Sequence, residues 1–251
     1  MKTNWHLPDE AGNQLSENEL TVLKGLLATF ADHPGFRHPI WDWLAGSSYT
    51  LEELQTFAKV YYGHVQLFRK YLAGAITVSS IEDTQVALAD ILSEEYGCRY
   101  NPDIQGYGPW HPELYRLFMQ SISVDPSESR TVPAIEGIEH FRSVHFAMFQ
   151  GGEEVETIGA VVFGMESSTP YRHERVATGL DRFGADHGMA IDHTFFSRHV
   201  EVDPRHGQGI LMTIRHWLDD SEKVELLRQG AFRSFDARKV FLDQVLNLSR
   251  R

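Results

Sequence analysis

Hydrophobic residues recur at helical spacing along nearly the whole chain. In residues 50–74, for example, Leu54, Phe57 and Tyr61 share one face of a helix. Alternation typical of strands is scarce, and the β-branched pair at 161–162 fits a helical stripe. The pattern predicts an all-α fold, a bundle of seven or more helices. We expect helices at residues 17–32, 38–45, 50–74, 81–96, 111–122, 133–149, 153–167, 171–183, 188–202, 204–218 and 221–248.

Capping signals mark the starts of two of these helices. Ser16 precedes the first, and Thr50 followed by Glu53 forms a capping box at the start of the third. Proline, glycine and serine gather in turns at residues 101–110 and 125–133. Since no repeat or linker separates these segments, we expect a single domain over residues 1–251, with a core of about 37–218.

Composition narrows the choice of partners. The formal charge is 23 − 35 = −12, which argues against nucleic acid and anionic membranes, because both attract basic surfaces. No apolar run reaches the length of a membrane span, and the N-terminal segment lacks the apolar core of a secretory signal. A single cysteine, Cys98, excludes an internal disulfide and a cysteine-based zinc site. We therefore expect a cytoplasmic protein that acts on a small molecule, with a homodimer left open.

The segment 195–206, FFSRHVEVDPRH, carries the strongest chemical signal. His199, Asp203 and His206 are spaced by four and three residues, so on one helix their side chains lie within roughly 60° of one another. Two imidazoles and a carboxylate on one face suit a transition metal, iron above all. The alternative is structural: Asp203 caps a new helix that begins at Pro204, and the two histidines only pack.

Three further candidate ligands lie on or beside apolar helix faces. Glu95 continues the stripe of Leu88, Ile91 and Leu92, so we expect it, rather than Glu94, to point inward. His111 precedes a helix that begins at Pro112, where a surface cap is the alternative. Glu166 ends an apolar ridge that contains two helix-weakening glycines, Gly159 and Gly164. With the earlier three residues, these side chains are numerous enough for two iron ions.

The other histidines and sequence motifs give weaker evidence of a functional site. His64 lies on an apolar face, where a hydrogen-bonded core histidine is the simpler interpretation, and we expect His140 and His145 to lie at the surface. The Glu-x-x-His pairs of ferritin-like bundles are absent, as are a phosphate-binding glycine loop and a nucleophile elbow.

In order and content, four blocks resemble the heme-oxygenase-like di-metal oxidases. These blocks are TLEELQTFAKVYYGHVQLF, ILSEEYG with HPELYRLF, IGAVVFGME, and FFSRHVEVDPRH. The resemblance covers about residues 37–218 and implies a heme-oxygenase-like bundle that binds two non-heme iron ions. Carried over residue by residue, it implies the ligands Glu95, His111, Glu166, His199, Asp203 and His206. The gap from Glu95 to His111 is longer than the family pattern, which suggests an insertion at residues 98–110.

The resemblance also implies an oxidoreductase that uses O2 as a co-substrate. Two ferrous ions would form a peroxo-bridged diferric species, which oxidises a small amino-acid-like or fatty-acid-like substrate. The outcome would be N-oxygenation or oxidative C–C cleavage. Polar aromatic residues of the first core helix, Tyr61, Tyr62 and His64, are candidates to line a modest polar pocket.

Several alternatives share the bundle. A thiaminase-like hydrolase needs a cysteine nucleophile in the pocket, and Cys98 follows a helix-ending glycine. A cofactor-free oxidase similar to pyrroloquinoline quinone synthase would not need these carboxylates. A heme oxygenase proper would need an axial histidine, for which His64 is the only candidate in the first core helix. A non-catalytic, partner-binding member of the fold would have no reason to bury three carboxylates beside three histidines.

Overall fold

The computed structural model describes residues 14–98, 100–101, 106–127 and 135–250. The elements are the helices α2 (Glu17–Ala31), α3 (Pro39–Gly46), α4 (Leu51–Val65), α5 (Phe68–Val78), α6 (Glu82–Glu95), α7 (His111–Ser121), α8 (Glu136–Phe149), α9 (Glu154–Gly159), η2 (Ala160–Met165), η3 (Glu166–Ser168), α10 (Thr169–His187), α11 (Thr194–Ile214), η4 (Arg215–Asp219) and α12 (Ser221–Ser249), and the strands β1 (Tyr100–Asn101) and β2 (Gly106–Tyr107). This is the predicted all-α fold, a bundle of helices to which the described residues add one short two-stranded sheet.

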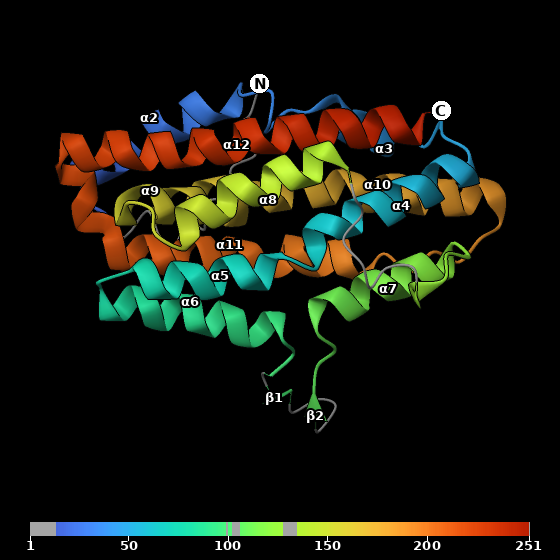
Figure 1. The fold of residues 1–251 in the computed structure, drawn as a ribbon, viewed down its shortest axis with the longest axis horizontal. Helices are drawn as coiled ribbons and strands as arrows, with labels where there is room; N and C mark the ends of the chain where they lie inside the picture. The colour runs from blue at the N-terminus through green and yellow to red at the C-terminus, as the bar shows by residue number, and fades with distance from the viewer. Residues whose placement is uncertain (1–13, 99, 102–105, 128–134, 251) are drawn as a thin grey trace.

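The helices pack as long, roughly parallel rods (Figure 1), and their buried hydrophobic side chains form one cluster. α12 runs the length of the molecule and packs against α8, α9 and the π-helical segment η2, while α10 pairs with α11. The buried cluster draws aromatic side chains from distant parts of the sequence, including Phe57, Phe118, Phe163 and Phe241. This continuous core fixes the helices from which the candidate ligands project.

Local signals place several helix ends. Ser16 and Thr50 each accept a hydrogen bond from the backbone three residues on, and Glu19 and Glu53 complete the two capping boxes. The predicted helix 50–74 is wrong as one element, because it divides into α4 and α5. At the division, Leu67 N–H bonds the carbonyl of His64, a tighter turn than the α-helical one.

The helix predicted to end at residue 202 does not end there. α11 continues through Pro204, so the interpretation of Asp203 as the cap of a new helix is wrong. Pro204 costs the helix one backbone hydrogen bond, but the buried faces on both sides of it keep the axis continuous. Asp203 is therefore a residue of the helix interior.

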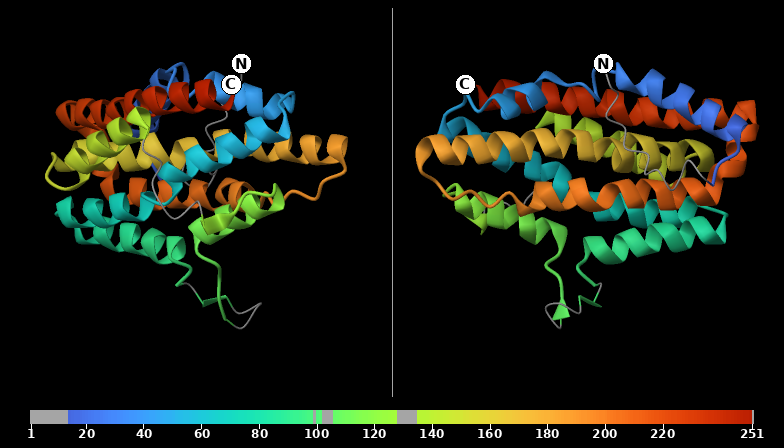
Figure 2. Two further views of the ribbon diagram at one scale, coloured as in Figure 1. Left: turned by 45° about the vertical axis from the view of Figure 1, so that its right-hand side comes forward. Right: turned by 180° about the vertical axis from the view of Figure 1, so that it is seen from behind.

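The segment between α6 and α7 leaves the bundle. β1 and β2 pair in antiparallel register and project away from the helices, as Figures 1 and 2 show from several sides. Gly97, at φ 65°, turns the chain out of α6. This arrangement agrees with an insertion between Glu95 and His111, and it leaves both residues at the base of the hairpin.

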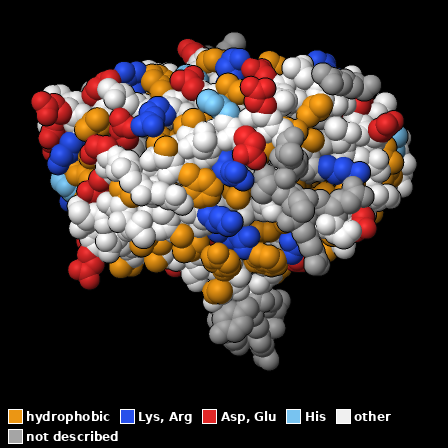
Figure 3. Space-filling model, in the orientation of Figure 1, with side chains coloured by type: hydrophobic (Ala, Val, Ile, Leu, Met, Phe, Trp, Pro, Cys, Tyr) orange, Lys and Arg blue, Asp and Glu red, His pale blue; other side chains and the backbone are white. Residues whose placement is uncertain are grey.

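The outer surface mixes acidic and basic side chains on the face shown in Figure 3. Within the described part of the chain, no helix combines the length and hydropathy needed to cross a membrane.

Candidate metal centre

The six predicted ligands are all buried, and the structure brings them together as two groups of three. Glu95, His111 and His199 form the first group, and Glu166, Asp203 and His206 form the second. Within each group the candidate ligand atoms lie within 4.8 Å of one another. Ligands of one ion lie at most about 4 Å apart, because metal–ligand bonds are about 2 Å long, so small rotations of the side chains suffice.

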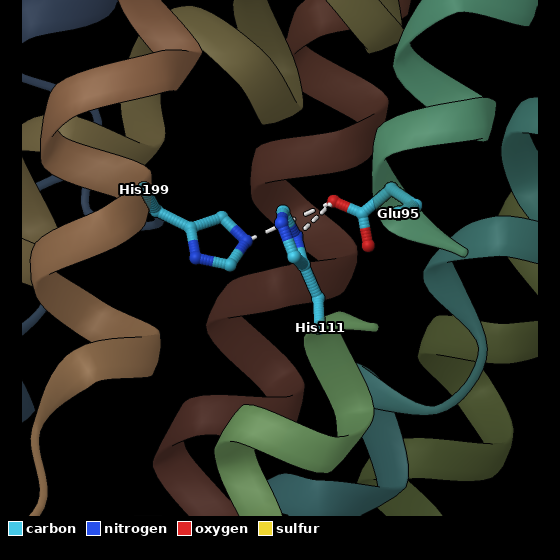
Figure 4. A group of neighbouring side chains, drawn as sticks. All are labelled: Glu95, His111 and His199. Atoms are coloured by element: carbon cyan, nitrogen blue, oxygen red, sulfur yellow. Dashed lines mark hydrogen bonds and ion pairs between the residues drawn. The ribbon is translucent and has the colours of Figure 1, made fainter. Parts of the chain in front are cut away.

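The first group joins three helices (Figure 4). Glu95, from the end of α6, places Oε1 2.7 Å from Nδ1 of His111, the first residue of α7. His199, from α11, places Nε2 3.8 Å from the same oxygen. The long gap between Glu95 and His111 therefore does not separate them, and Glu95 does point inward.

A backbone contact orients His199. Its Nδ1–H donates to the carbonyl of Phe195 at 2.6 Å, which leaves the Nε2 lone pair directed toward Glu95. Burial lowers the pKa of His199, so the ring is neutral, as a metal ligand must be. Burial raises the pKa of Glu95, but the charge of His111 and its hydrogen bond to the carboxylate outweigh burial and hold the pKa well below its usual range.

The second group depends on an irregular backbone. The π-helical turn of η2 and the 3-10 turn of η3 interrupt the helical run just before and at Glu166. Such interruptions often occur at functional sites because they turn one side chain out of the regular helical register. Gly207 of α11 faces this segment, and a Cβ there would lie 2.6 Å from Ser167 Oγ. The glycine thus allows α11 to approach Glu166 closely.

Within the second group, His206 Nδ1 lies 3.3 Å from Glu166 Oε2 and 3.7 Å from Asp203 Oδ1. Burial disfavours a charged His206, but the nearby carboxylates of Glu166, Glu94 and Asp203 outweigh it and raise the pKa of His206 to about 11. Burial and the neighbouring charge of Glu166 raise the pKa of Asp203 well above its ordinary value. A bound cation would favour the unprotonated forms of both side chains, because metal ligands bind without their protons.

Sequence reasoning missed the role of Glu94, which we expected to point aside. It is 7% exposed, and its Oε2 lies 3.3 Å from Nε2 of His206, while Arg198 donates to its Oε1 at 3.1 Å. A carboxylate behind a ligand histidine fixes the ring and increases its basicity. The adjacent Glu94–Glu95 pair at the helix end was the available signal.

A polar cavity of about 40 Å³ adjoins both groups. Glu95, His199, Glu166 and Asp203 contribute to its wall, and so do Tyr61 and His64, as expected from the sequence. Tyr62 does not line it and instead accepts a hydrogen bond from Arg116. The wall also contains side chains that we had not singled out, namely Val65, Phe68, Met165, Thr169, Arg172, His173, Phe195 and Arg238.

Two histidine predictions need correction. His145 is buried rather than at the surface, because its Nδ1–H donates to the carbonyl of Phe141 and its Nε2 accepts from Ser234. His64 is not a fully hydrogen-bonded core histidine, since its buried Nδ1 lacks a partner. Cys98 is exposed and does not line the cavity, so it is poorly placed as a nucleophile.

The buried ligand atoms of this site have the chemistry of a metal site. Glu166 Oε1 is buried without a hydrogen-bond partner, an expensive state for a carboxylate oxygen. Imidazole and carboxylate ligands suit iron, and a buried set of this kind is costly to maintain unless a cation neutralises it. The residues present therefore fit a pair of iron ions.

The arrangement of helices defines the class of protein. A TenA homologue from Pseudomonas syringae pv. tomato superimposes with a TM-score of 0.71 at 12% identity, over 98% of this chain and 99% of that one. A CADD-like protein from Nostoc punctiforme gives 0.74 at 15% identity, over 94% and 97% of the two chains. A domain with a heme oxygenase-like fold from Shewanella denitrificans gives 0.64 at 13% identity, over 96% and 94%. The fold is heme-oxygenase-like, as the sequence predicted.

Sequence comparison defines the family. The model of the family described as iron-containing redox enzyme matches residues 55–239, and the chain belongs to this family. The chain is also similar to 4-aminobenzoate synthase of Chlamydia muridarum, at 26% identity over 86% of this chain and 87% of that protein. The namesake enzyme of Chlamydia trachomatis serovar D is 27% identical over 79% and 80% of the two chains.

Proposed function

We propose that this protein is a non-heme di-iron enzyme that uses O2 to oxidise a small amino-acid-like substrate. The observation that carries the proposal is the pair of buried ligand groups on one cavity. Membership of an iron-containing redox enzyme family supports the metal. The name 4-aminobenzoate synthase, carried by two relatives, supports chemistry on a compound that bears an amine and a carboxylate.

In this proposal each ligand group holds one ion. Glu95, His111 and His199 hold the first, and Glu166, Asp203 and His206 hold the second. When bound, ferrous iron supplies the electrons that reduce dioxygen. Behind the second group, the Glu94 carboxylate would hold the Nε2–H of His206 and leave Nδ1 to face Glu166 and the ion position.

The cavity favours a small substrate over a fatty acid. At about 40 Å³ it has room for a few water-sized groups, and a long acyl chain would have to displace packed side chains. Its wall combines charged and neutral polar groups with a few apolar ones, which suits a compact polar molecule. The exposed position of Cys98 argues against a thiaminase-like hydrolase.

The test is anaerobic loading with ferrous iron, followed by measurement of iron per chain and of O2 uptake. A panel of amino acids, aminobenzoates and fatty acids is added, and products, including 4-aminobenzoate, are sought by mass spectrometry. We expect two irons per chain and O2 uptake that is stimulated by an amino acid. Failure to bind iron, or O2 uptake unaffected by every compound and by removal of iron, would contradict the proposal.

A further inference from the structure

Two arginines lie inside the protein on the wall of the cavity. Arg172 projects from α10 and Arg238 from α12, and each is only 2% exposed. Arg172 donates to the Ser168 carbonyl at 3.1 Å and to Thr169 Oγ1 at 2.5 Å. Among the residues that the structure describes, Arg238 donates only to Ser168 Oγ, at 3.5 Å, and its Nη2 has no hydrogen-bond partner. Within the described ranges of the chain, neither guanidinium forms a salt bridge with a carboxylate.

Such a pair is expensive to keep. A buried cation without a counter-ion recovers only part of its lost hydration from neutral hydrogen-bond acceptors and from aromatic rings such as those of Trp41 and Phe235, and a second cation beside it adds repulsion. Burial and the charge of Arg172 lower the pKa of Arg238 well below its usual value. Apolar residues of similar volume would make a more stable core. The charges of Arg172 and Arg238 therefore indicate a role other than stabilising the fold.

The candidate metal ligands do not supply the missing counter-ion. Asp203 and Glu166 influence Arg172 electrostatically, but both lie against His206. The same cavity wall holds two more buried nitrogens without partners, Nδ1 of His64 and Nδ1 of His173. Burial lowers the pKa of both histidines, so these rings are neutral and leave the cationic role to the arginines.

We propose that Arg172 and Arg238 bind the carboxylate of the substrate inside this cavity. A planar guanidinium presents paired donors that match the two oxygens of a carboxylate, and burial strengthens the contact. Residues of both ligand groups line the same cavity, so a carboxylate held there lies beside them. The substrate class is then a small carboxylic acid, such as an amino acid. This inference rests on the proposed function and adds the feature by which the substrate is recognised.

The experiment compares acetate with acetamide, which have nearly the same shape but differ in charge. Binding is followed by two-dimensional NMR of the full-length protein, in its metal-free form and anaerobically loaded with iron, at constant ionic strength. We expect saturable binding of acetate and none of acetamide in both forms. Arg238→Met should weaken acetate binding by about tenfold or more, because it removes a buried charged partner.

Arg233→Met is the matched control. Arg233 lies on the same helix and carries the same charge, but it is exposed and pairs with Glu156. Its replacement should leave acetate binding unchanged. Arg238→Lys, which keeps the charge but not the paired donors, should weaken binding less than Arg238→Met, and it serves as the test if the methionine variant does not fold.

Thermal unfolding separates binding from a structural role. If Arg238 serves a ligand, Arg238→Met should unfold at the same temperature as the wild type or higher. Equal binding of acetate and acetamide, or full acetate binding by both Arg238 variants, would overturn the inference while iron-dependent O2 uptake remained intact. Loss of iron binding by the wild type would instead contradict the proposed function and leave acetate binding unaffected.

Discussion

The carboxylate of Glu94 stands behind His206, on the side away from Glu166 and Asp203, and is itself held by Arg198. We predict that Glu94→Gln weakens binding of one iron by about 10- to 100-fold, because the ring loses the partner that orients it. Competition with a chelator measures this affinity. Glu201→Gln is the control, since Glu201 also approaches Arg198 but is exposed. Equal effects of the two variants would show that Glu94 does not support His206 as a ligand.

Asp203 tests the assignment of ligands to two groups. It lies in the interior of α11, 3% exposed, and it belongs to the group of Glu166 and His206. We predict that Asp203→Ala strongly lowers O2-dependent turnover while about one iron per chain remains bound in the group of His199. Iron analysis and oxygen electrode traces provide the readout. Asp243→Ala, which removes a half-exposed carboxylate elsewhere, should change neither. Two tightly bound irons with normal activity would show that Asp203 is not a ligand.

The sequence indicates which helix faces carry Arg172 and Arg238, but it does not show that their charged groups are buried. Arg172 stands four residues before Val176 and eight before Leu180, and Arg238 precedes Phe241 and Leu242 at helical spacing, so both occupy apolar faces. These spacings can be seen in the sequence alone. A long side chain on such a face commonly extends its charge to solvent, however, and only the packing of α10 and α12 shows that these do not.

The close approach of α11 to the Glu166 segment depends on Gly207. A methyl group there would lie 2.6 Å from Ser167 Oγ and 3.6 Å from Glu166 Cβ. We predict that Gly207→Ala weakens iron binding and lowers the unfolding temperature, because α11 must move away from the second ligand group.

Gly209 offers the matched control on the same helix. Nothing lies within 4 Å of a Cβ built there, so Gly209→Ala should stabilise the protein by up to about 1 kcal/mol through helix propensity. Iron affinity should stay unchanged. If the two variants behaved alike in unfolding and in iron titrations, the close contact at Gly207 would contribute neither to stability nor to iron binding.

The helices were largely predictable, and the exceptions have physical causes. Periodicity located α2, α4, α7 and α12, since each buries an apolar face, and capping residues marked the starts of α2 and α4. Pro204 suggested a helix end that the structure lacks, because tertiary packing on both sides outweighs one lost hydrogen bond. The π-helical turn before Glu166 carries no local signal beyond its glycine, so the sequence indicated an ordinary helix there.

The packing of the helices against one another was harder to predict than the residues that each helix turns inward. The stripe that contains Glu95 shows that this residue faces the core, yet it cannot tell which histidine it meets. That information comes from the order in which α6, α7 and α11 pack, which the family resemblance supplied and spacing alone did not. The division of His199 and His206 between two groups likewise depends on the helices that face α11.

Burial of histidines predicts how the whole molecule responds to acid. Burial lowers the pKa of His145 to about 3, in spite of its bond to the Phe141 carbonyl, while an unfolded chain has the ordinary value of about 6.5. Between these two values the unfolded state binds a proton that the folded state does not. Stability is therefore complete above about pH 6.5 and falls as the pH decreases, by about 1.4 kcal/mol per pH unit for each such proton.

Urea unfolding of the metal-free protein at a series of pH values between 7 and 5 measures this dependence. His145→Gln should unfold more easily at pH 7, because it disturbs the bonds to Phe141 and Ser234, but its stability should fall less steeply with acid, by about one proton. His140→Gln changes an exposed histidine on the same helix and should retain the wild-type slope. The slope, rather than the stability at one pH, decides the matter, because a purely steric effect of the substitution would shift the whole curve without changing its gradient. Identical gradients for wild type and His145→Gln would mean that His145 titrates in the folded protein as it does in the unfolded chain.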